Sequence, residues 1–400
     1  MKFRRPRFSM RVLLIAMLVL GTGLGFLGRR LIQIRSEADR QLEVIEELRK
    51  HGAAITVHER GAMRLFETLV HKIDGRTRFT RVSRVTLGKS PIEDKDIAQI
   101  AKLSGLEVFH DYYGHCTDES LAILANCSTL KEVQLSNWKG TAQGAKALLR
   151  GRAPIRQLTL FTVSVDDEFF AVAARAPHLE LLWIEGAKVS ANGIRELKAS
   201  KSMSKLAIDH GRGLGSGLAI LANHPTLQSV RLREYLFAEV DVADFAKLHG
   251  LNRLQIDCET FPQGVLQSIG SCHDLLELTL SGEFSGEESE FSLGCSKLEA
   301  ITIKDSTPRP ELLLRELAKL KHLKRIELPK TSLNREDLEL LYGHPSLEHL
   351  SMKAAGAPVE AITRLQRQLR KCDVWIVYSD GRRYHYPSDG SAPKLVLPGL

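Results

Sequence analysis

The chain has 400 residues, of which 43% are hydrophobic and 26% charged, so its composition excludes a wholly disordered protein. The formal net charge is +8, but residues 1–50 hold eleven Lys and Arg against five Asp and Glu and account for +6 of it. The other 350 residues are nearly neutral, which argues against DNA or RNA as a partner. Six Cys are far too few for a disulfide-stabilised scaffold.

Residues 1–30 are predicted to form a basic N-terminus and a transmembrane signal anchor. Five bases within the first eleven residues precede Val12–Gly28, an apolar run of seventeen residues without charge or proline. That length is at the short limit of a membrane span. One alternative is a cleaved signal peptide, but Leu24, Phe26 and Leu27 continue the apolar run where small residues are expected. The other is a buried soluble helix, which would have to bury the run between charged ends.

The bases that flank this run predict the side of the membrane on which the rest of the chain lies. Five precede the run and four follow it closely, and the short basic tail favours an N-terminus inside. We therefore expect a single-pass membrane protein whose remaining residues are extracytoplasmic.

Most of the chain is a tandem repeat. Cores of the form L-x-x-L-x-L recur at intervals of 23 to 25 residues. They begin at Val82, Leu106, Leu130, Ile155, Leu179, Met203, Leu227, Leu251, Leu275, Leu298, Leu323 and Leu347, and a thirteenth follows in DVWIVY. Each unit has an alternating stretch and then apolar residues three apart, which predicts a short strand, a turn and a short helix.

Units of this size cannot bury their own apolar faces, so neighbours must stack around one core. The segments LEVFHDYYGHC, LKEVQLSNWKG, LELLWIEGAKV and LEHLSMKAAGA resemble leucine-rich repeats of the ribonuclease-inhibitor-like type. The resemblance implies an α/β solenoid, or horseshoe, of about 13 strand-turn-helix units with a period of 24. Its parallel sheet would form the concave face and its helices the convex face. The sequence departs from the family where Gly114, Trp138 and Val163 replace the usual Asn or Cys, so other contacts must hold the loop edge.

The repeat pattern also predicts the domain boundaries. Residues 31–80 are assigned to a juxtamembrane helix and N-terminal cap, 81–357 to the leucine-rich-repeat array, 358–380 to a C-terminal cap and 381–400 to a flexible tail. Within the N-terminal cap we expect helices at Leu42–Leu48 and Met63–Ile73 and an edge strand at Ala53–Val57. A basic anchor, a helix and a 24-residue array in this order also resemble the bacterial membrane-anchored leucine-rich-repeat proteins.

The sequence contains no recognisable catalytic or metal-binding motif. The motifs C-x-x-C, G-x-S-x-G and H-E-x-x-H are absent. Cys127, Cys272 and Cys295 each precede a repeat leucine by three residues, which predicts buried packing, and Cys258 is predicted to be the most exposed thiol. The histidines of APHL, NHPTL and GHPSL are assigned to turns. We therefore predict that the protein is not an enzyme and uses neither a cofactor nor a metal.

Strand residues that alternate with the core should line the concave face, where a partner is predicted to bind. Exposed aromatics beside arginines are the usual composition of an interaction patch. The predicted partner-binding residues are His110, Tyr112, Phe161, Trp183, Asp209, Arg231, Arg233 and Asp257. An alternative interpretation of the same face is a cross-strand ladder in which Arg233 lies between Asp209 and Asp257.

These features lead to one functional hypothesis and one alternative. The hypothesis is a membrane-tethered interaction module that binds a protein or an extended polymer on the concave sheet. The alternative is a structural cell-envelope spacer, or a module that assembles with copies of itself.

Overall fold

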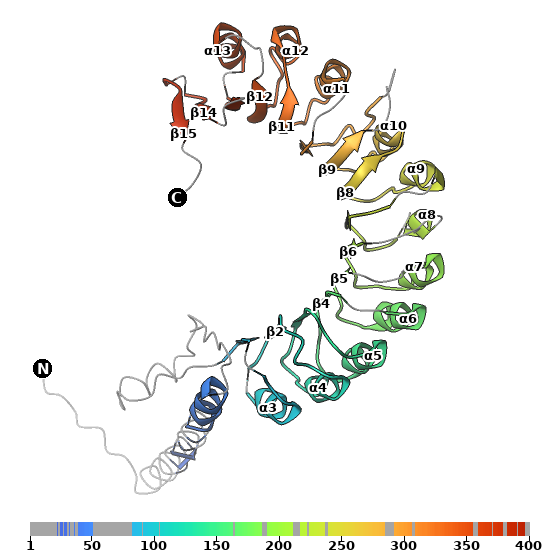
Figure 1. Ribbon diagram of the computed structural model, residues 1–400, viewed down its shortest axis with the longest axis vertical. Helices are drawn as coiled ribbons and strands as arrows, with labels where there is room; N and C mark the ends of the chain where they lie inside the picture. Colours follow the sequence, from blue (N-terminus) through green and yellow to red (C-terminus); the bar gives the residue numbers. More distant parts are fainter. Residues whose placement is uncertain are drawn as a thin grey trace, which may run out of the picture.

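The structure is a computed structural model. It describes residues 22, 25–26, 28–29, 32, 36, 39–50 and 82–396, the last range without 90, 104, 163–164, 186–189, 211–216, 222–223, 237–238, 285–291, 306–308, 355–358, 370, 379–381 and 390. Strands and helices alternate along an open arc, with the strands on its inner side and the helices on its outer side (Figure 1). Within these residues, fifteen strands form one sheet in sequence order.

The sheet has thirteen parallel strands followed by two antiparallel ones. The strands are β1 (Arg84–Leu87), β2 (Val108–Asp111), β3 (Glu132–Leu135), β4 (Gln157–Leu160), β5 (Leu181–Glu185), β6 (Lys205–Asp209), β7 (Ser229–Arg233), β8 (Arg253–Phe261), β9 (Glu277–Phe284), β10 (Ala300–Ile303), β11 (Arg325–Ser332), β12 (His349–Ala354), β13 (Asp373–Tyr378), β14 (Arg383–Tyr386) and β15 (Lys394–Val396). The helices are α3 (Asp94–Ile100), α4 (Asp118–Leu124), α5 (Ala142–Arg150), α6 (Asp167–Arg175), α7 (Ala191–Leu197), α8 (Gly217–Leu221), α9 (Glu239–Phe245), α10 (Val265–Gly270), α11 (Pro310–Leu317), α12 (Arg335–Glu339) and α13 (Val359–Gln368).

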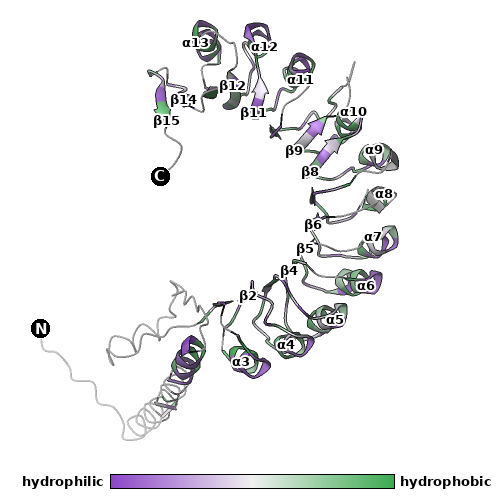
Figure 2. Cartoon of the chain, viewed as in Figure 1, coloured by the Kyte–Doolittle hydropathy of each residue, from purple (hydrophilic) through white to green (hydrophobic). Residues whose placement is uncertain are grey.

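The repeat leucines decide which face of the sheet is buried. In β5, Leu182 and Ile184 are fully buried, whereas Trp183 between them is only partly buried. The helix that precedes this strand buries Phe169 and Phe170 against the same core. Hydrophilic residues lie on the outer surfaces of helices such as α6 and α7 (Figure 2). The predicted solenoid, with a concave parallel sheet and convex helices, is confirmed.

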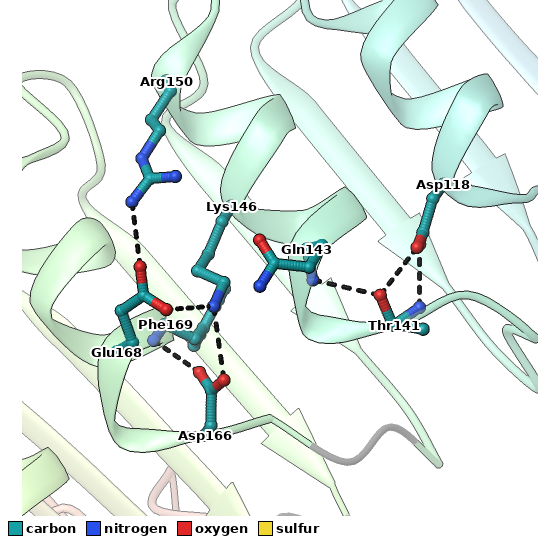
Figure 3. A network of polar contacts seen from close by, with 8 residues as sticks. All are labelled: Asp118, Thr141, Gln143, Lys146, Arg150, Asp166, Glu168 and Phe169. Carbon is teal, nitrogen blue, oxygen red and sulfur yellow. Dashed lines mark hydrogen bonds and ion pairs between the residues drawn. The ribbon is translucent and has the colours of Figure 1, made fainter.

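Neighbouring helices are joined by a hydrogen bond between an N-cap hydroxyl and an aspartate. Thr141 is the N-cap of α5, and its Oγ1 donates to Oδ2 of Asp118, the first residue of α4, at 2.6 Å (Figure 3). The N-cap Ser190 of α7 donates in the same way to Asp167, the first residue of α6, at 2.8 Å. Each hydroxyl also accepts a backbone N–H from the first turn of its own helix, Gln143 for Thr141 and Asn192 for Ser190. One side chain therefore caps its helix, which is worth about 1 kcal/mol, and fixes that helix to the preceding repeat.

A buried lysine adds to this helix layer (Figure 3). Nζ of Lys146 in α5 lies 2.7 Å from Glu168 and 3.2 Å from Asp166, and Arg150 also pairs with Glu168 at 3.2 Å. The hydrogen bond that the Lys146 ammonium donates to Glu168 raises the pKa of Lys146. Since both carboxylates are about half exposed, solvent screens the pairs, and their main effect is to fix the relative position of α5 and α6.

The loop edge beyond the strands is held without the family's asparagine. Asn137, Thr162, His210 and Glu234 follow neighbouring strands and all have left-handed backbone, with φ between 47° and 59°. At the turn that follows β2, one repeat earlier, the fully buried Asp111 accepts four backbone hydrogen bonds instead, from the N–H groups of residues 113–116. The repeating turn and a buried carboxylate therefore hold the loop edge.

Two expectations from the sequence are wrong. Cys258 is not exposed: β8 continues to Phe261, so Cys258 follows Leu254 and Ile256 into the core, and burial raises the pKa of its thiol to about 12. Residues 381–400 are not simply a flexible tail, because β14 and β15 lie within them. Tyr386 of β14 is buried and pairs with Val374, so this hairpin covers the edge of β13 that would otherwise be open.

The N-terminal predictions lie largely outside the described residues. Residues 39–50 are helical, which agrees with the helix expected at Leu42–Leu48, and Val44, Ile45 and Leu48 join the core of the array. The strand and helix expected at 53–57 and 63–73 lie outside the described residues, as does most of Val12–Gly28. Within the part of the chain that is described, no helix has the length and apolar character needed to span a membrane.

Candidate binding surface on the concave sheet

The parallel register places residues one repeat apart side by side on the concave face. Trp183 pairs with Ala207, Ala207 with Arg231, and Arg231 with Gln255. Two residues further along the strands, Glu185, Asp209 and Arg233 form a second row. Because the helices lie on the other side of the sheet, these rows face the open interior of the arc (Figure 1).

Five of the predicted site residues, Phe161, Trp183, Asp209, Arg231 and Arg233, lie together and are called the central cluster here. Phe161 meets the Trp183 ring edge-on, with 5.1 Å between centroids. The Arg231 guanidinium lies 4.8 Å from the centroid of the same ring, and the indole Nε1 donates to Asp209 Oδ2 at 3.0 Å. Such a cation–π contact contributes about 0.5 to 2 kcal/mol. Trp183 is thus held by three neighbours, which fixes the position of Arg231.

Asp209 is the most unusual member of the central cluster. Only 2% of its side chain is exposed, although it lies on the open face of the sheet. Its Oδ2 is shared by Trp183 and by Arg233, whose Nη1 is 3.6 Å away. Its Oδ1 and the Nε of Arg231 are buried and have no hydrogen-bond partner among the described residues. Buried polar atoms without partners are rare in folded proteins, so a water or a ligand is expected here.

The ladder interpretation is correct in part. Arg233 contacts Asp209, but no ion pair joins it to Asp257 among the described residues. The sequence did not predict a neighbouring trio in which His210 Nδ1 lies 2.7 Å from Glu234 and Nε2 lies 3.4 Å from Glu185. Glu185 is the last residue of β5, His210 follows β6 and Glu234 follows β7, so the trio lies at the rim of the central cluster.

His110 and Tyr112 form a separate group on and just after β2. His110 is largely buried, its Nε2 is 2.9 Å from Glu132, and its Nδ1 is 3.1 Å from the Tyr112 hydroxyl. Phe161 directly follows β4, and one strand, β3, lies between β2 and β4. With Trp183 one strand further on, in β5, this group is two to three strand spacings, about 10 to 15 Å, from the central cluster. The structure therefore divides the predicted site into two parts and leaves Asp257, on β8, beside the larger one.

Turns explain why His224 and His344 stand at the same position of their repeats, three residues before a repeat leucine. His224 Nδ1 accepts the backbone N–H of Thr226 and Leu227, and its Nε2 is 3.0 Å from the Leu197 carbonyl. Burial lowers the pKa of His224, and also that of His344 in the equivalent turn. The turn assignment is therefore confirmed for His224. Within the described residues, no group of three or more His, Cys, Asp or Glu could hold a metal ion.

The lowered pKa of His224 predicts acid sensitivity. Because the folded protein disfavours the protonated ring, its stabilising contribution is complete above the unfolded pKa of about 6.5 and is lost as pH falls through the lower folded pKa. We expect the free energy of unfolding in urea to fall between pH 7 and pH 5, and His224→Gln to reduce this slope. His178→Gln, at an exposed histidine of the matching turn, is the control. An unchanged slope in His224→Gln would contradict the prediction.

The architecture follows from three observations: one continuous core of repeat leucines, a parallel sheet in sequence order, and helices on its outer side. The protein is a leucine-rich-repeat solenoid. No protein-family model matches the chain, and no curated protein matches it.

Among solved structures, 144 chains match the solenoid. One is an internalin, InlF, from Listeria monocytogenes, at 12% identity and TM-score 0.47, with 76% of this chain and 86% of that chain covered. Another is the ectodomain of the Arabidopsis thaliana receptor kinase GASSHO1/SCHENGEN3 with CASPARIAN STRIP INTEGRITY FACTOR 2, at 16% identity and TM-score 0.36, covering 70% and 39%. A third is the plant peptide hormone receptor RGFR1 in complex with RGF2, at 16% identity and TM-score 0.35, with 70% of this chain and 53% of that chain covered. At these identities the likeness concerns the fold alone.

Proposed function

We propose that the solenoid is a membrane-tethered, non-catalytic interaction module that binds a protein or an extended polymer on its concave sheet. The observation that carries this proposal is the Asp209 carboxylate, which is buried in the open face with one oxygen lacking a partner among the described residues. A protein with an apolar residue at such a position is often at least as stable as one with a buried charge there. A partner that donates a hydrogen bond to this oxygen would explain why a carboxylate is placed there.

The composition of the central cluster supports the same proposal. Trp and Arg are the residues most enriched at the energetic centres of protein interfaces. Trp183 and Arg231 are fixed against each other before any partner arrives, so little side-chain freedom is lost on binding. Comparing partner capture by the parent chain with capture by Trp183→Ala/Arg231→Ala tests this function. A structural spacer would show no difference between the two.

Membrane tethering is proposed from the sequence, through the basic N-terminus and the apolar run Val12–Gly28. We expect a tag placed after Leu400 to be digested by protease in intact cells, or once only the outer envelope is opened. A tag placed before Met1 should stay protected under the same conditions and serves as the control. Protection of the C-terminal tag until the inner membrane is broken would reverse the proposed orientation and make the solenoid a cytoplasmic scaffold.

A further inference from the structure

Charged residues follow the first leucine of most repeats and pair across neighbouring repeats along one edge of the concave sheet. This edge row reads Glu107, Lys131, Arg156, Glu180, Ser204, Gln228, Asn252, Leu276, Glu299, Lys324 and Glu348. Lys131 lies 3.2 Å from Glu107, Arg156 lies 3.0 Å from Glu180, and Lys324 lies 2.9 Å from Glu299. Four consecutive members in the middle of the row carry no charge.

The uncharged stretch coincides with a hollow in the surface. Its volume is about 260 Å³, and it is lined by Ser204, Gln228, Asn252 and Leu276 of the edge row and by Lys205, Ser229, Arg253 and Glu277 next to them. Small-molecule sites usually have roughly 300 to 1,000 Å³. The hollow is therefore suited to one or two side chains of a larger ligand.

The polar groups around the hollow are available to a ligand. The side chains of Lys205, Gln228 and Asn252 make no hydrogen bond or ion pair within the described part of the chain. Arg253 is already paired with Glu277 at 2.9 Å, so Lys205 provides the unpaired charge. Gln228 and Asn252 lie on neighbouring repeats, and each carboxamide offers both a donor and an acceptor, the same pair of groups that a peptide bond presents.

We infer that this hollow binds an extended peptide segment of a partner protein that carries an acidic side chain. The carboxamides of Gln228 and Asn252 bind the peptide backbone, and the Lys205 ammonium pairs with the carboxylate. On β6 and β7, Lys205 and Ser229 precede Ala207 and Arg231 by two residues on the same face, a separation of about 7 Å. The inference thus rests on the proposed function and extends the binding surface from the central cluster to the edge of the sheet.

The test is selection from a displayed library of random twelve-residue peptides on the full chain in a mild detergent. We expect the selected peptides to contain Asp or Glu. Lys205→Glu should weaken their binding at least tenfold, and Gln228→Ala/Asn252→Ala should have a similar effect. Lys201→Glu reverses the charge of an exposed lysine at the preceding turn and should leave binding within twofold.

Three results would overturn the inference: no peptide selected, peptides without acidic residues, or equal binding by Lys205→Glu and the parent chain. A fourth contradicting result could come from a glycan array probed with the same variants. If the parent chain binds glycans and Lys205→Glu alone loses that binding, the hollow is a saccharide site. If only Trp183→Ala/Arg231→Ala weakens binding of the selected peptides, the hollow is not their binding site, and the proposed function still stands. Loss of partner capture only in Lys205→Glu would instead overturn the role of the central cluster.

Discussion

The solenoid with Trp183→Ala and Arg231→Ala is expected to lose capture of its partner, with affinity reduced at least about 30-fold. The two side chains stack at 4.8 Å on the open face of the sheet, and Trp183 also binds Asp209. Truncating one residue at the energetic centre of an interface costs about 2 kcal/mol or more, and tenfold in affinity corresponds to 1.4 kcal/mol. Affinity capture from a cell-envelope extract, followed by titration of the captured partner, measures the loss.

The matched control is a second cation–π pair on the helix side of the solenoid. Arg364 lies 5.5 Å from the centroid of the Tyr342 ring, so Tyr342→Ala/Arg364→Ala removes the same chemistry away from the concave sheet. Both double variants should unfold at similar temperatures, and only the concave one should lose the partner. Equal capture by the concave variant and the parent chain would reject the central cluster as a binding site.

Phe170→Ala is expected to lower the free energy of unfolding by about 3 to 5 kcal/mol. Phe170 is fully buried in α6 and contacts Phe169 edge-on, with 5.6 Å between ring centroids. Removing a buried ring loses its transfer free energy and leaves a cavity that the surrounding repeats fill only in part. The loss is a large share of the 5 to 15 kcal/mol that stabilises a typical domain. Urea denaturation followed by circular dichroism measures it.

The control for this core prediction is Phe170→Leu, which keeps most of the volume and should cost about 1 kcal/mol. Because each repeat contacts only its neighbours, hydrogen exchange in Phe170→Ala should increase most in α5, α6 and α7 and little in α11. An alanine variant as stable as the leucine variant, or exchange raised equally along the whole chain, would contradict this account.

The sequence by itself predicted the architecture and the rows of the concave face. A constant repeat places residue i beside the residue one repeat later in a parallel sheet, so Trp183, Ala207 and Arg231 could be aligned by counting, and the structure pairs them in that order. The leucine spacing likewise identified the buried face, since side chains alternate along a strand. The turn role of His224 followed from its position just before a repeat leucine, beside a proline.

Tertiary structure decided which members of those rows act together. Periodicity gives the face on which a side chain lies, but not its reach or its partners, so the burial of Asp209 and the separation of His110 from Trp183 were not predictable. The burial of Cys258 depended on β8 continuing past the usual strand length, and the β14–β15 hairpin depended on an open edge at β13. The hollow beside Lys205 formed where four repeats lack a charged edge residue, and only neighbouring repeats in register bring those groups together.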